Sequence, residues 1–238
     1  MFWWITASVC AFFVKGLCGF ANTLIFTSIL SFAADNVNIS PVELLLGYPT
    51  NLILVWQERK SVDWGVCLPL AALMIAGSVP GILFLKNADS GAIKIFFGAV
   101  IIVVGLEMLT QEFRRKKAAP SKALLGVIGA LSGFLCGLYG VGALLGAYMS
   151  RVTEDSGAFR ANLCVVFFIE STLRVFLYAL WGILTLDILK RALLLSPFML
   201  AGLALGILAS RALDETLAKK CVIVMLLVSG AALILNSL

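Results

Sequence analysis

Long apolar stretches and short polar loops alternate along the whole chain. A single straight helix needs about 20 residues to cross the apolar core of a bilayer, and most of the stretches are close to that length. The pattern predicts eight apolar helical segments, at about residues 2–33, 40–56, 64–85, 91–110, 123–149, 158–181, 187–210 and 215–236. We therefore expect an all-α polytopic membrane protein.

Two of these segments are interrupted by glycines. Residues 2–33 are too long for one straight span, and the sequence in their middle, residues 15–22, holds a lysine, two glycines and an asparagine. A related glycine-rich sequence, residues 135–142, lies inside the segment 123–149. Non-helical backbone at membrane depth is tolerated only where it is buried in protein or lines a cavity. A matching pair of such breaks in two halves of a chain points to a transporter binding site.

The two halves of the chain resemble each other. Residues 76–81 and 201–206 share a pattern of small residues about 125 positions apart, and the breaks align at an offset of either 118 or 121 residues. We infer an internal duplication. It divides the chain into a first membrane repeat at 1–113, a basic linker at 114–122 and a second membrane repeat at 123–238.

The distribution of lysine and arginine favours re-entrant hairpins at the two breaks. With hairpins there, the loops on one side of the membrane hold twelve Lys and Arg residues, against four on the other side. The bias is weaker if all eight segments span. Because cytoplasmic loops are enriched in positive charge, we expect two inverted repeats, each a glycine-broken re-entrant helix hairpin plus three transmembrane helices. The linker 114–122 is then cytoplasmic.

Composition supports a membrane location and argues against several functions. The chain is 61% hydrophobic with a mean hydropathy of +1.06, whereas soluble domains are about 45–50% apolar. It has no histidine, and its six cysteines form no CxxC pair, so we expect no metal site, no cofactor and no enzymatic activity. No GxxxxGKS/T sequence is present, which argues against ATP-driven transport. The net charge of +5 gathers in loops and does not indicate a nucleic-acid partner.

Several carboxylates resemble helix caps. Residues 40–43, of sequence SPVE, place serine, proline and glutamate as a capping box would at the start of a helix, so we interpret Glu43 as a cap. The same interpretation applies to the aspartates that open four later segments, because carboxylates suit the positive end of the helix dipole. They are Asp63, Asp89, Asp187 and Asp214.

Four ionisable residues remain at membrane depth: Lys15, Glu107, Glu170 and Arg174. Such residues are costly in a bilayer and mark functional sites. Glu107 is close enough to the basic linker to reach the interface. Glu170 and Arg174 share a helix face and form either an internal ion pair or an anion site in which Glu170 orients the anion or takes up a proton. Lys15 pairs either with Glu170 or a carbonyl of another segment, or binds an anion at the break.

Neutral groups near the breaks are further candidates. Free N–H groups at a helix start favour negative charge, and glycine lets a ligand approach the backbone. Three asparagines and a threonine would add donors, and each asparagine would alternatively hold helices together: Asn22, Thr23, Asn51 and Asn162. The Leu-Cys-Gly triplets of Cys18 and Cys136 present either small buried hydrophobes or thiols that face a sulfur-containing substrate.

The twin glycine-rich segments, the basic central linker, the eight apolar segments and the length of 238 residues together resemble the sulfite exporter TauE/SafE family of permeases. The resemblance implies secondary transport of small sulfur-containing or organic anions, such as sulfite or sulfonates, across the bacterial inner membrane. The first break lacks the proline that members usually carry soon after it, which bears on the substrate more than on the fold. The positions that match the family's glycine-rich segments are Gly16, Gly19, Phe20, Gly137, Gly140 and Gly142.

Residues and resemblance together predict a proton-coupled exporter of a small sulfur-containing anion. The expected partners are that anion and the lipid bilayer, and a homodimer is the oligomer we consider. Glu170 is the predicted coupling residue. The alternatives are a passive anion channel and a non-transporting scaffold or accessory subunit. The predicted substrate-binding residues are Lys15, Gly16, Gly19, Phe20, Asn22, Asn51, Gly137, Gly140, Gly142, Asn162 and Arg174.

Overall fold

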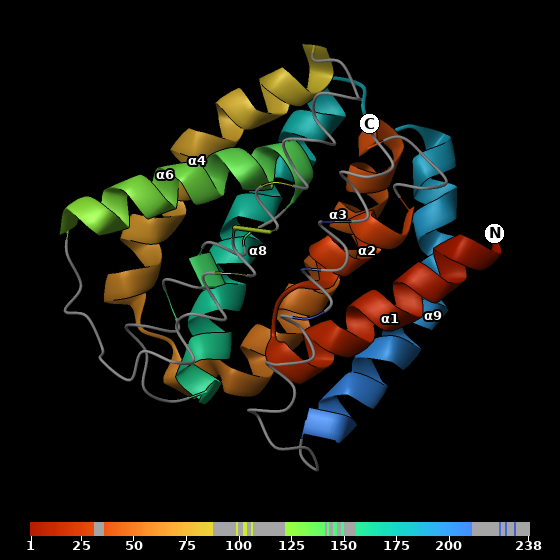
Figure 1. Cartoon of the computed structure of the whole chain (residues 1–238), viewed down its shortest axis with the longest axis horizontal. Coiled ribbons are helices and arrows are strands. Elements are labelled where there is room, and N and C mark those ends of the chain that lie inside the picture. Colours follow the sequence, from red (N-terminus) through yellow and green to blue (C-terminus); the bar gives the residue numbers. More distant parts are fainter. Residues whose placement is uncertain are drawn as a thin grey trace.

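The computed structural model describes residues 1–30, 36–87, 122–140 and 156–210, and single positions within the stretches 99–106, 142–149 and 224–231. Across these residues every regular element is a helix (Figure 1). The elements are α1 (Phe2–Cys18), α2 (Asn22–Leu30), α3 (Asn36–Glu58), the 3-10 helix η1 (Arg59–Ser61), α4 (Trp64–Asn87), α6 (Lys122–Tyr139), α8 (Ser156–Leu180) and α9 (Leu186–Ser210). The predicted all-α architecture is confirmed.

Among the described residues, four helices are long and apolar enough to cross a membrane. They lie at Asn38–Ser61, Trp64–Phe84, Gly157–Leu180 and Leu186–Ser210, and shorter apolar helices lie at Phe2–Leu17 and Gly129–Leu138. Many large apolar side chains point outward from the spans, as in Leu68, Phe84, Phe176, Leu193 and Leu208. Because soluble monomers rarely expose large apolar patches, this surface suits lipid. The chain is an integral multi-pass membrane protein.

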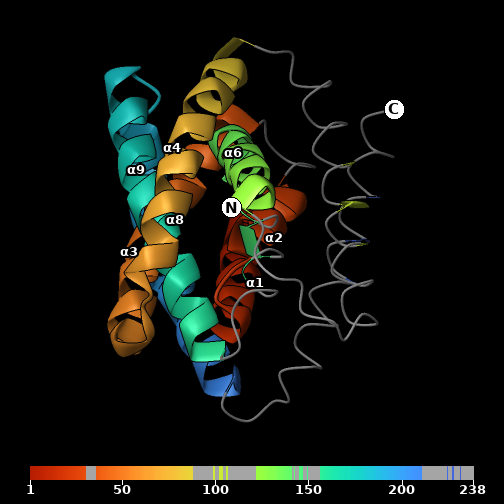
Figure 2. The same cartoon turned by 90° about the vertical axis from the view of Figure 1, so that its left-hand side faces the viewer.

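The described helices form two layers (Figure 2). The helices with the four candidate spans, α3, α4, α8 and α9, make one layer, and α1, α2 and α6 lie on one face of it. Within this arrangement α3 packs against α8 at the centre, while α4 packs against α6 on one side and α1 against α9 on the other (Figure 1). The ends of both short apolar helices, α1 and α6, thereby lie beside the central α3–α8 pair.

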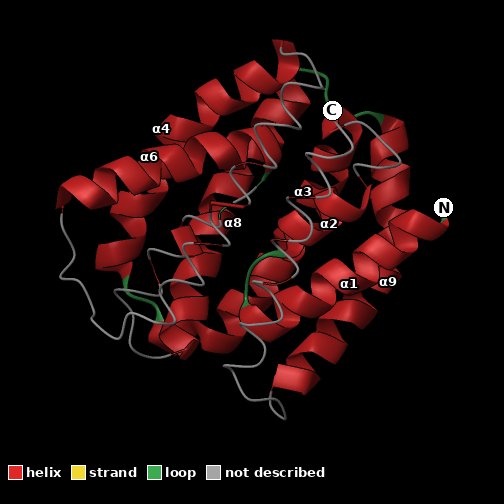
Figure 3. Cartoon of the chain, in the orientation of Figure 1, coloured by secondary structure: helices red, strands yellow, loops and turns green. Residues whose placement is uncertain are grey.

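Both predicted breaks are present. α1 ends at Gly19, which adopts the left-handed conformation with φ 83° and donates its N–H to the Lys15 carbonyl at 2.7 Å. A short loop follows before α2 begins (Figure 3). In the second half Gly140 has φ 75° and donates to the Cys136 carbonyl at 2.6 Å. The breaks therefore correspond at the offset of 121 residues and not at 118.

The helices before the breaks pack on partners from the opposite half, and they do so reciprocally. A Cβ added to Gly16 would lie 2.6 Å from the Leu203 carbonyl oxygen of α9, and one added to Gly137 would lie 2.2 Å from the Ser78 carbonyl oxygen of α4. Small residues allow this close approach of backbones in membranes. The two glycines are 121 residues apart and their partners 125 residues apart, which matches the offsets of the sequence duplication. The inverted orientation of the repeats stays a prediction.

The predicted capping box at residues 40–43 is wrong. α3 begins at Asn36, so Ser40 and Glu43 lie inside the helix, and Pro41 and Pro49 lie inside it as well. The Ser40 hydroxyl pairs with the Tyr178 hydroxyl of α8 at 3.2 Å and does not cap. Neighbouring helices and side chains can satisfy the backbone groups that a proline frees in a membrane helix, which is why the SPVE pattern does not mark a helix start here.

The other predicted caps are partly tested. Asp63 directly precedes α4 and accepts a hydrogen bond from the Gly65 N–H at 2.9 Å, as a cap does. Asp187 lies in the first turn of α9. Asp89, Asp214 and Glu107 lie outside the described residues, as do most of the linker 114–122 and most of the segments at 91–110 and 215–236.

Candidate functional site

A small polar cavity lies where the ends of the broken helices meet α3 and α8. It measures about 30 Å³, a space on the scale of one or two water molecules. Its lining combines four buried ionisable side chains with amides, hydroxyls and glycine backbone. The predicted residues that line it are Lys15, Phe20, Asn22, Asn51, Gly140, Gly142, Glu170 and Arg174, and the lining also includes Thr23, Glu43, Gly47 and Cys136.

Lys15 is held by neutral acceptors. It lies in the last turn of α1 with 2% of its surface exposed. Its Nζ donates to the Asn51 Oδ1 at 2.7 Å and to the Gly47 carbonyl at 3.3 Å, both in α3. Of the alternatives for its partner, a carbonyl of another segment is the correct one. Within the described part of the chain no carboxylate forms an ion pair with it.

Arg174 lies between two carboxylates. Its Nη2 is 3.8 Å from the Glu43 Oε2, and its Nε is 3.9 Å from the Glu170 Oε1. Its Nη1 donates to the Cys136 carbonyl at 2.5 Å, near the end of α6. The predicted Glu170–Arg174 pair is therefore confirmed, and a second carboxylate joins it. Two anions around one guanidinium offset the large cost of burying that charge.

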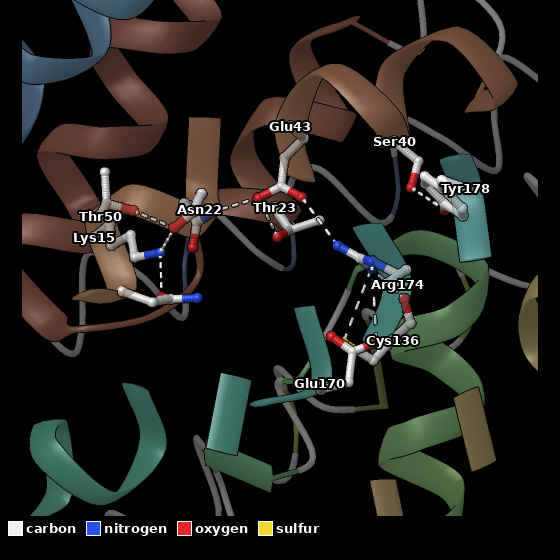
Figure 4. A network of polar contacts seen from close by, with 12 residues as sticks. Lys15, Asn22, Thr23, Ser40, Glu43, Thr50, Cys136, Glu170, Arg174 and Tyr178 are labelled. Atoms are coloured by element: carbon white, nitrogen blue, oxygen red, sulfur yellow. Dashed lines mark hydrogen bonds and ion pairs between the residues drawn. The ribbon is translucent and has the colours of Figure 1, made fainter. Parts of the chain in front are cut away.

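Glu43 is the site residue that the sequence interpretation missed. It is 2% exposed, and its Oε1 accepts hydrogen bonds from Asn22 Nδ2 at 2.5 Å and Thr23 Oγ1 at 2.7 Å. Figure 4 shows Glu43 between these two residues, the first of α2, and Arg174 on the other side. The sequence did contain a signal for this role, because a carboxylate inside an apolar segment often marks a functional site. We interpreted Glu43 as a helix cap because residues 40–43 match a capping box.

Glu170 is poorly satisfied for a buried carboxylate. It is fully buried, and neither of its oxygens accepts a hydrogen bond of ordinary geometry from the described residues, although the Cys136 thiol lies beside it. Its main compensation is the pair with Arg174. A buried charge without hydrogen bonds is expensive, so the pair with Arg174 is what compensates the burial of this carboxylate.

The predicted glycines divide into two groups. Gly140 and Gly142 line the cavity. A Cβ on Gly140 would lie 2.8 Å from Arg174 Nη1 and 3.0 Å from Glu43 Oε2, so the absence of a side chain makes room for that ion pair. Gly16 and Gly137 serve the helix packing described above, and Gly19 turns the chain beside Arg160; these three do not line the cavity.

The structure does not bring Asn162 to the cavity. Its Oδ1 accepts a hydrogen bond from the Asp63 backbone N–H at 2.7 Å, so it connects α8 to the start of α4. Cys136 lies in the cavity wall, whereas the side chain of Cys18 is outside the described residues. Among the described residues no group of three or more His, Cys, Asp or Glu side chains is able to hold a metal ion.

The charges of the cavity balance when all four groups are ionised. Lys15 and Arg174 supply two positive charges, and Glu43 and Glu170 supply two negative charges. Arg174 is already paired and Lys15 contacts only neutral groups. If one of the two carboxylates were protonated, the net charge of the cavity would be +1, and a single monoanion would neutralise it.

Comparison with known proteins gives one family. The family model described as "Sulfite exporter TauE/SafE" matches residues 4–233. No curated protein and no solved structure matched the chain. The matched region runs from the start of α1 past the end of α9 and includes every residue of the cavity. On the strength of this match over nearly the whole chain, the protein belongs to the TauE/SafE sulfite exporter family.

Proposed function

We propose that this protein is a secondary transporter that exports a small sulfur-containing anion, such as sulfite or an organosulfonate, across the bacterial inner membrane. The family is one of membrane transporters for anions of this class. The observation that carries the proposal is the cavity itself: two buried cations, one from each half of the chain, line a single small space between two broken helices.

Lys15 and Arg174 recognise the charge of the anion in this proposal. Lys15 makes the first attraction because only neutral acceptors compete for it. Asn22 and Asn51 supply polar contacts beside the cations, and Phe20 closes the wall. The left-handed turn at Gly140 brings backbone to the cavity without a side chain, so that an anion can approach it.

Glu170 couples transport to protons in this proposal. The support is its burial without ordinary hydrogen bonds among the described residues and its pair with Arg174. When Glu170 takes up a proton, Arg174 loses one of its two partners and the cavity gains a positive charge. Proton and anion then bind together, because each removes the charge imbalance that the other creates.

Alternating access follows from the packing of the two repeats. α1 packs against α9, and α6 packs against α4, so each repeat contacts a helix of the other repeat. Rocking of one repeat against the other around a fixed central site is the movement expected of repeat-built transporters. The linker 114–122 lies in the cytoplasm in this proposal, and a homodimer is the assembly we consider.

The test is uptake of labelled sulfite and small sulfonates into proteoliposomes under an imposed pH gradient. Wild type is compared with Lys15→Ala and Arg174→Ala, with Lys60→Ala as a matched control, because Lys60 is exposed in η1 and outside the cavity. We expect saturable, gradient-dependent flux, with kcat/KM lower by at least about tenfold in either cavity variant, since the loss of a buried charge partner is costly.

Other outcomes separate the alternatives. Normal flux in both folded cavity variants would refute the assigned site. Flux that neither saturates nor depends on the gradient would indicate a passive anion channel. Absence of flux in wild type, with assembly changed in the variants, would favour a scaffold or accessory subunit.

A further inference from the structure

We propose that the Glu43 carboxylate is a tethered anion that occupies the substrate position, and that the transported anion binds by displacing it. This inference deepens the proposed function and rests on it. It assigns Glu43 the role of a competitor that sets how tightly the site holds its substrate.

The contacts of Glu43 are those of a bound anion. Its carboxylate receives hydrogen bonds from Asn22 and Thr23 at the start of α2, and the Arg174 guanidinium approaches from the opposite side at 3.8 Å. Both donors are side-chain groups, the Asn22 amide and the Thr23 hydroxyl, and such donors together with an arginine can hold an oxyanion. The sequence predicts anion binding at this helix start, and the structure places a carboxylate of the chain itself there (Figure 4).

Charge and space prevent an incoming anion from sharing this place. The cavity measures about 30 Å³, and two negative charges side by side in a buried site repel strongly. The charged groups that face Glu43 are Arg174 and Glu170 from α8 and Lys15 from α1. Lys15 can attract the anion from its own side of the cavity, so that the anion replaces Glu43 as the partner of Arg174.

The position of Glu43 has no acidic counterpart in the second half. Asn51 and Arg174 lie beside the ends of the two broken helices and are 123 residues apart. The same offset applied to Glu43 leads to Val166, a buried apolar residue of α8. The cavity thus holds two cations and two carboxylates, and Glu43 is the carboxylate that also accepts hydrogen bonds from α2.

Displacement of Glu43 would also release a contact between the two halves. The carboxylate connects α2 of the first half to α8 of the second through Asn22, Thr23 and Arg174. An anion that takes its place at Arg174 has no covalent link to α3. Binding therefore loosens one connection between the repeats, which ties substrate entry to their relative movement.

The experiment measures sulfite binding by calorimetry on the full chain in detergent and sulfite flux in proteoliposomes. Glu43→Gln keeps the size of the side chain and removes its charge, and Glu58→Gln is the matched control at the other end of α3, outside the cavity. We expect the dissociation constant of Glu43→Gln to fall by about tenfold or more, because a like charge no longer competes. Glu43→Asp, with a shorter reach to Arg174, should lie between wild type and Glu43→Gln.

The outcomes distinguish this inference from the proposed function. If wild type binds sulfite and Glu43→Gln binds it equally or more weakly, the tethered-anion role is refuted while transport stands. If wild type neither binds nor carries sulfite or a sulfonate, the proposed function fails and the inference with it. Should both Glu43 variants fail to fold, the infrared difference spectrum of wild type on sulfite addition decides: a shifted carboxylate band supports displacement, and an unchanged one refutes it.

Discussion

Lys15 and Cys136 occupy equivalent places in the two halves of the protein. They are 121 residues apart, and each lies in the last turn of a broken helix. Each carbonyl accepts a hydrogen bond from a left-handed glycine four residues later, Gly19 at 2.7 Å and Gly140 at 2.6 Å. The same backbone turn thus carries a cation in the first half and a thiol in the second.

The spans next to the two breaks, α3 and α8, differ in the opposite way. Asn51 of α3 contacts Lys15, and Arg174 of α8 contacts Cys136. In the first half the cation is on the broken helix and the neutral partner on the span, whereas in the second half the cation is on the span. Each half therefore supplies one positive charge to the cavity from a different element.

The fork of the Arg174 side chain should matter as much as its charge. Arg174→Lys keeps the charge but cannot reach Glu43, Glu170 and the Cys136 carbonyl together. We expect kcat/KM for sulfite flux to fall by about tenfold or more in Arg174→Lys. Arg59→Lys, at an exposed arginine outside the cavity, is the control. Wild-type flux in Arg174→Lys would show that a point charge is sufficient.

Gly140→Ala should lower the rate of transport for a steric reason, in addition to the loss of stability that its left-handed backbone would cause. The residue has φ 75°, and an added Cβ would press on Arg174 and Glu43. Gly182→Ala is a close control, because Gly182 has φ 68° and nothing within 4 Å of the added atom. Both variants should lose about 1–2 kcal/mol of stability from the left-handed backbone, and only Gly140→Ala should lower flux. Equal flux in the two folded variants would exclude the steric effect.

Gly137→Ala should weaken the crossing of α6 with α4. The added Cβ would lie 2.2 Å from the Ser78 carbonyl oxygen, so the helices must separate. Gly126→Ala, in the same helix with no atom near the added Cβ, should leave stability unchanged or raise it slightly. Thermal unfolding in detergent checks both variants. A melting temperature for Gly137→Ala equal to that of Gly126→Ala would refute the tight crossing.

Substitutions of Asn162 and Asn51 should have different effects: the first should lower stability, and the second should weaken substrate binding. Asn162→Ala removes the acceptor of the half-buried Asp63 N–H, and the net contribution of such a hydrogen bond is about 0.5–1.5 kcal/mol of stability, while KM for sulfite stays near the wild-type value. Asn51→Ala removes the acceptor that orients Lys15 in the cavity and should raise KM. A raised KM in a folded Asn162→Ala variant would place that residue in the transport path.

The fold was predictable from the sequence at the level of segments. Apolar length and charge distribution identified a helical membrane protein, and the glycines at 16, 19, 137 and 140 marked both breaks. The offset between the breaks was not predictable, because two alignments fitted equally well. Hydrogen bonds from Gly19 and Gly140 decide it, and such backbone geometry leaves no mark in composition.

The part of the candidate site that was predictable from the sequence consists of ionisable residues at membrane depth. Lys15, Glu170 and Arg174 stood out because ionisable residues are rare at membrane depth, and all three line the cavity. Glu43 was missed because its local sequence matches a cap, and only the position of α2 across from it reveals its partners. Asn162 was misplaced because which helix an asparagine faces depends on packing between distant segments.

The crossing of α1 with α9 also bears on how the chain is made. Gly16 is synthesised early, whereas the Leu203 backbone that it packs against follows 187 residues later. At ordinary rates of translation this delay is on the order of ten seconds or more. Chains truncated before α9 should therefore be cut by protease near α1 more readily than the complete chain. The contacts of α1 with α2 and α3 can form well before α9 is made, whereas its packing on α9 has to wait, so the two sides of the same helix fold at different times.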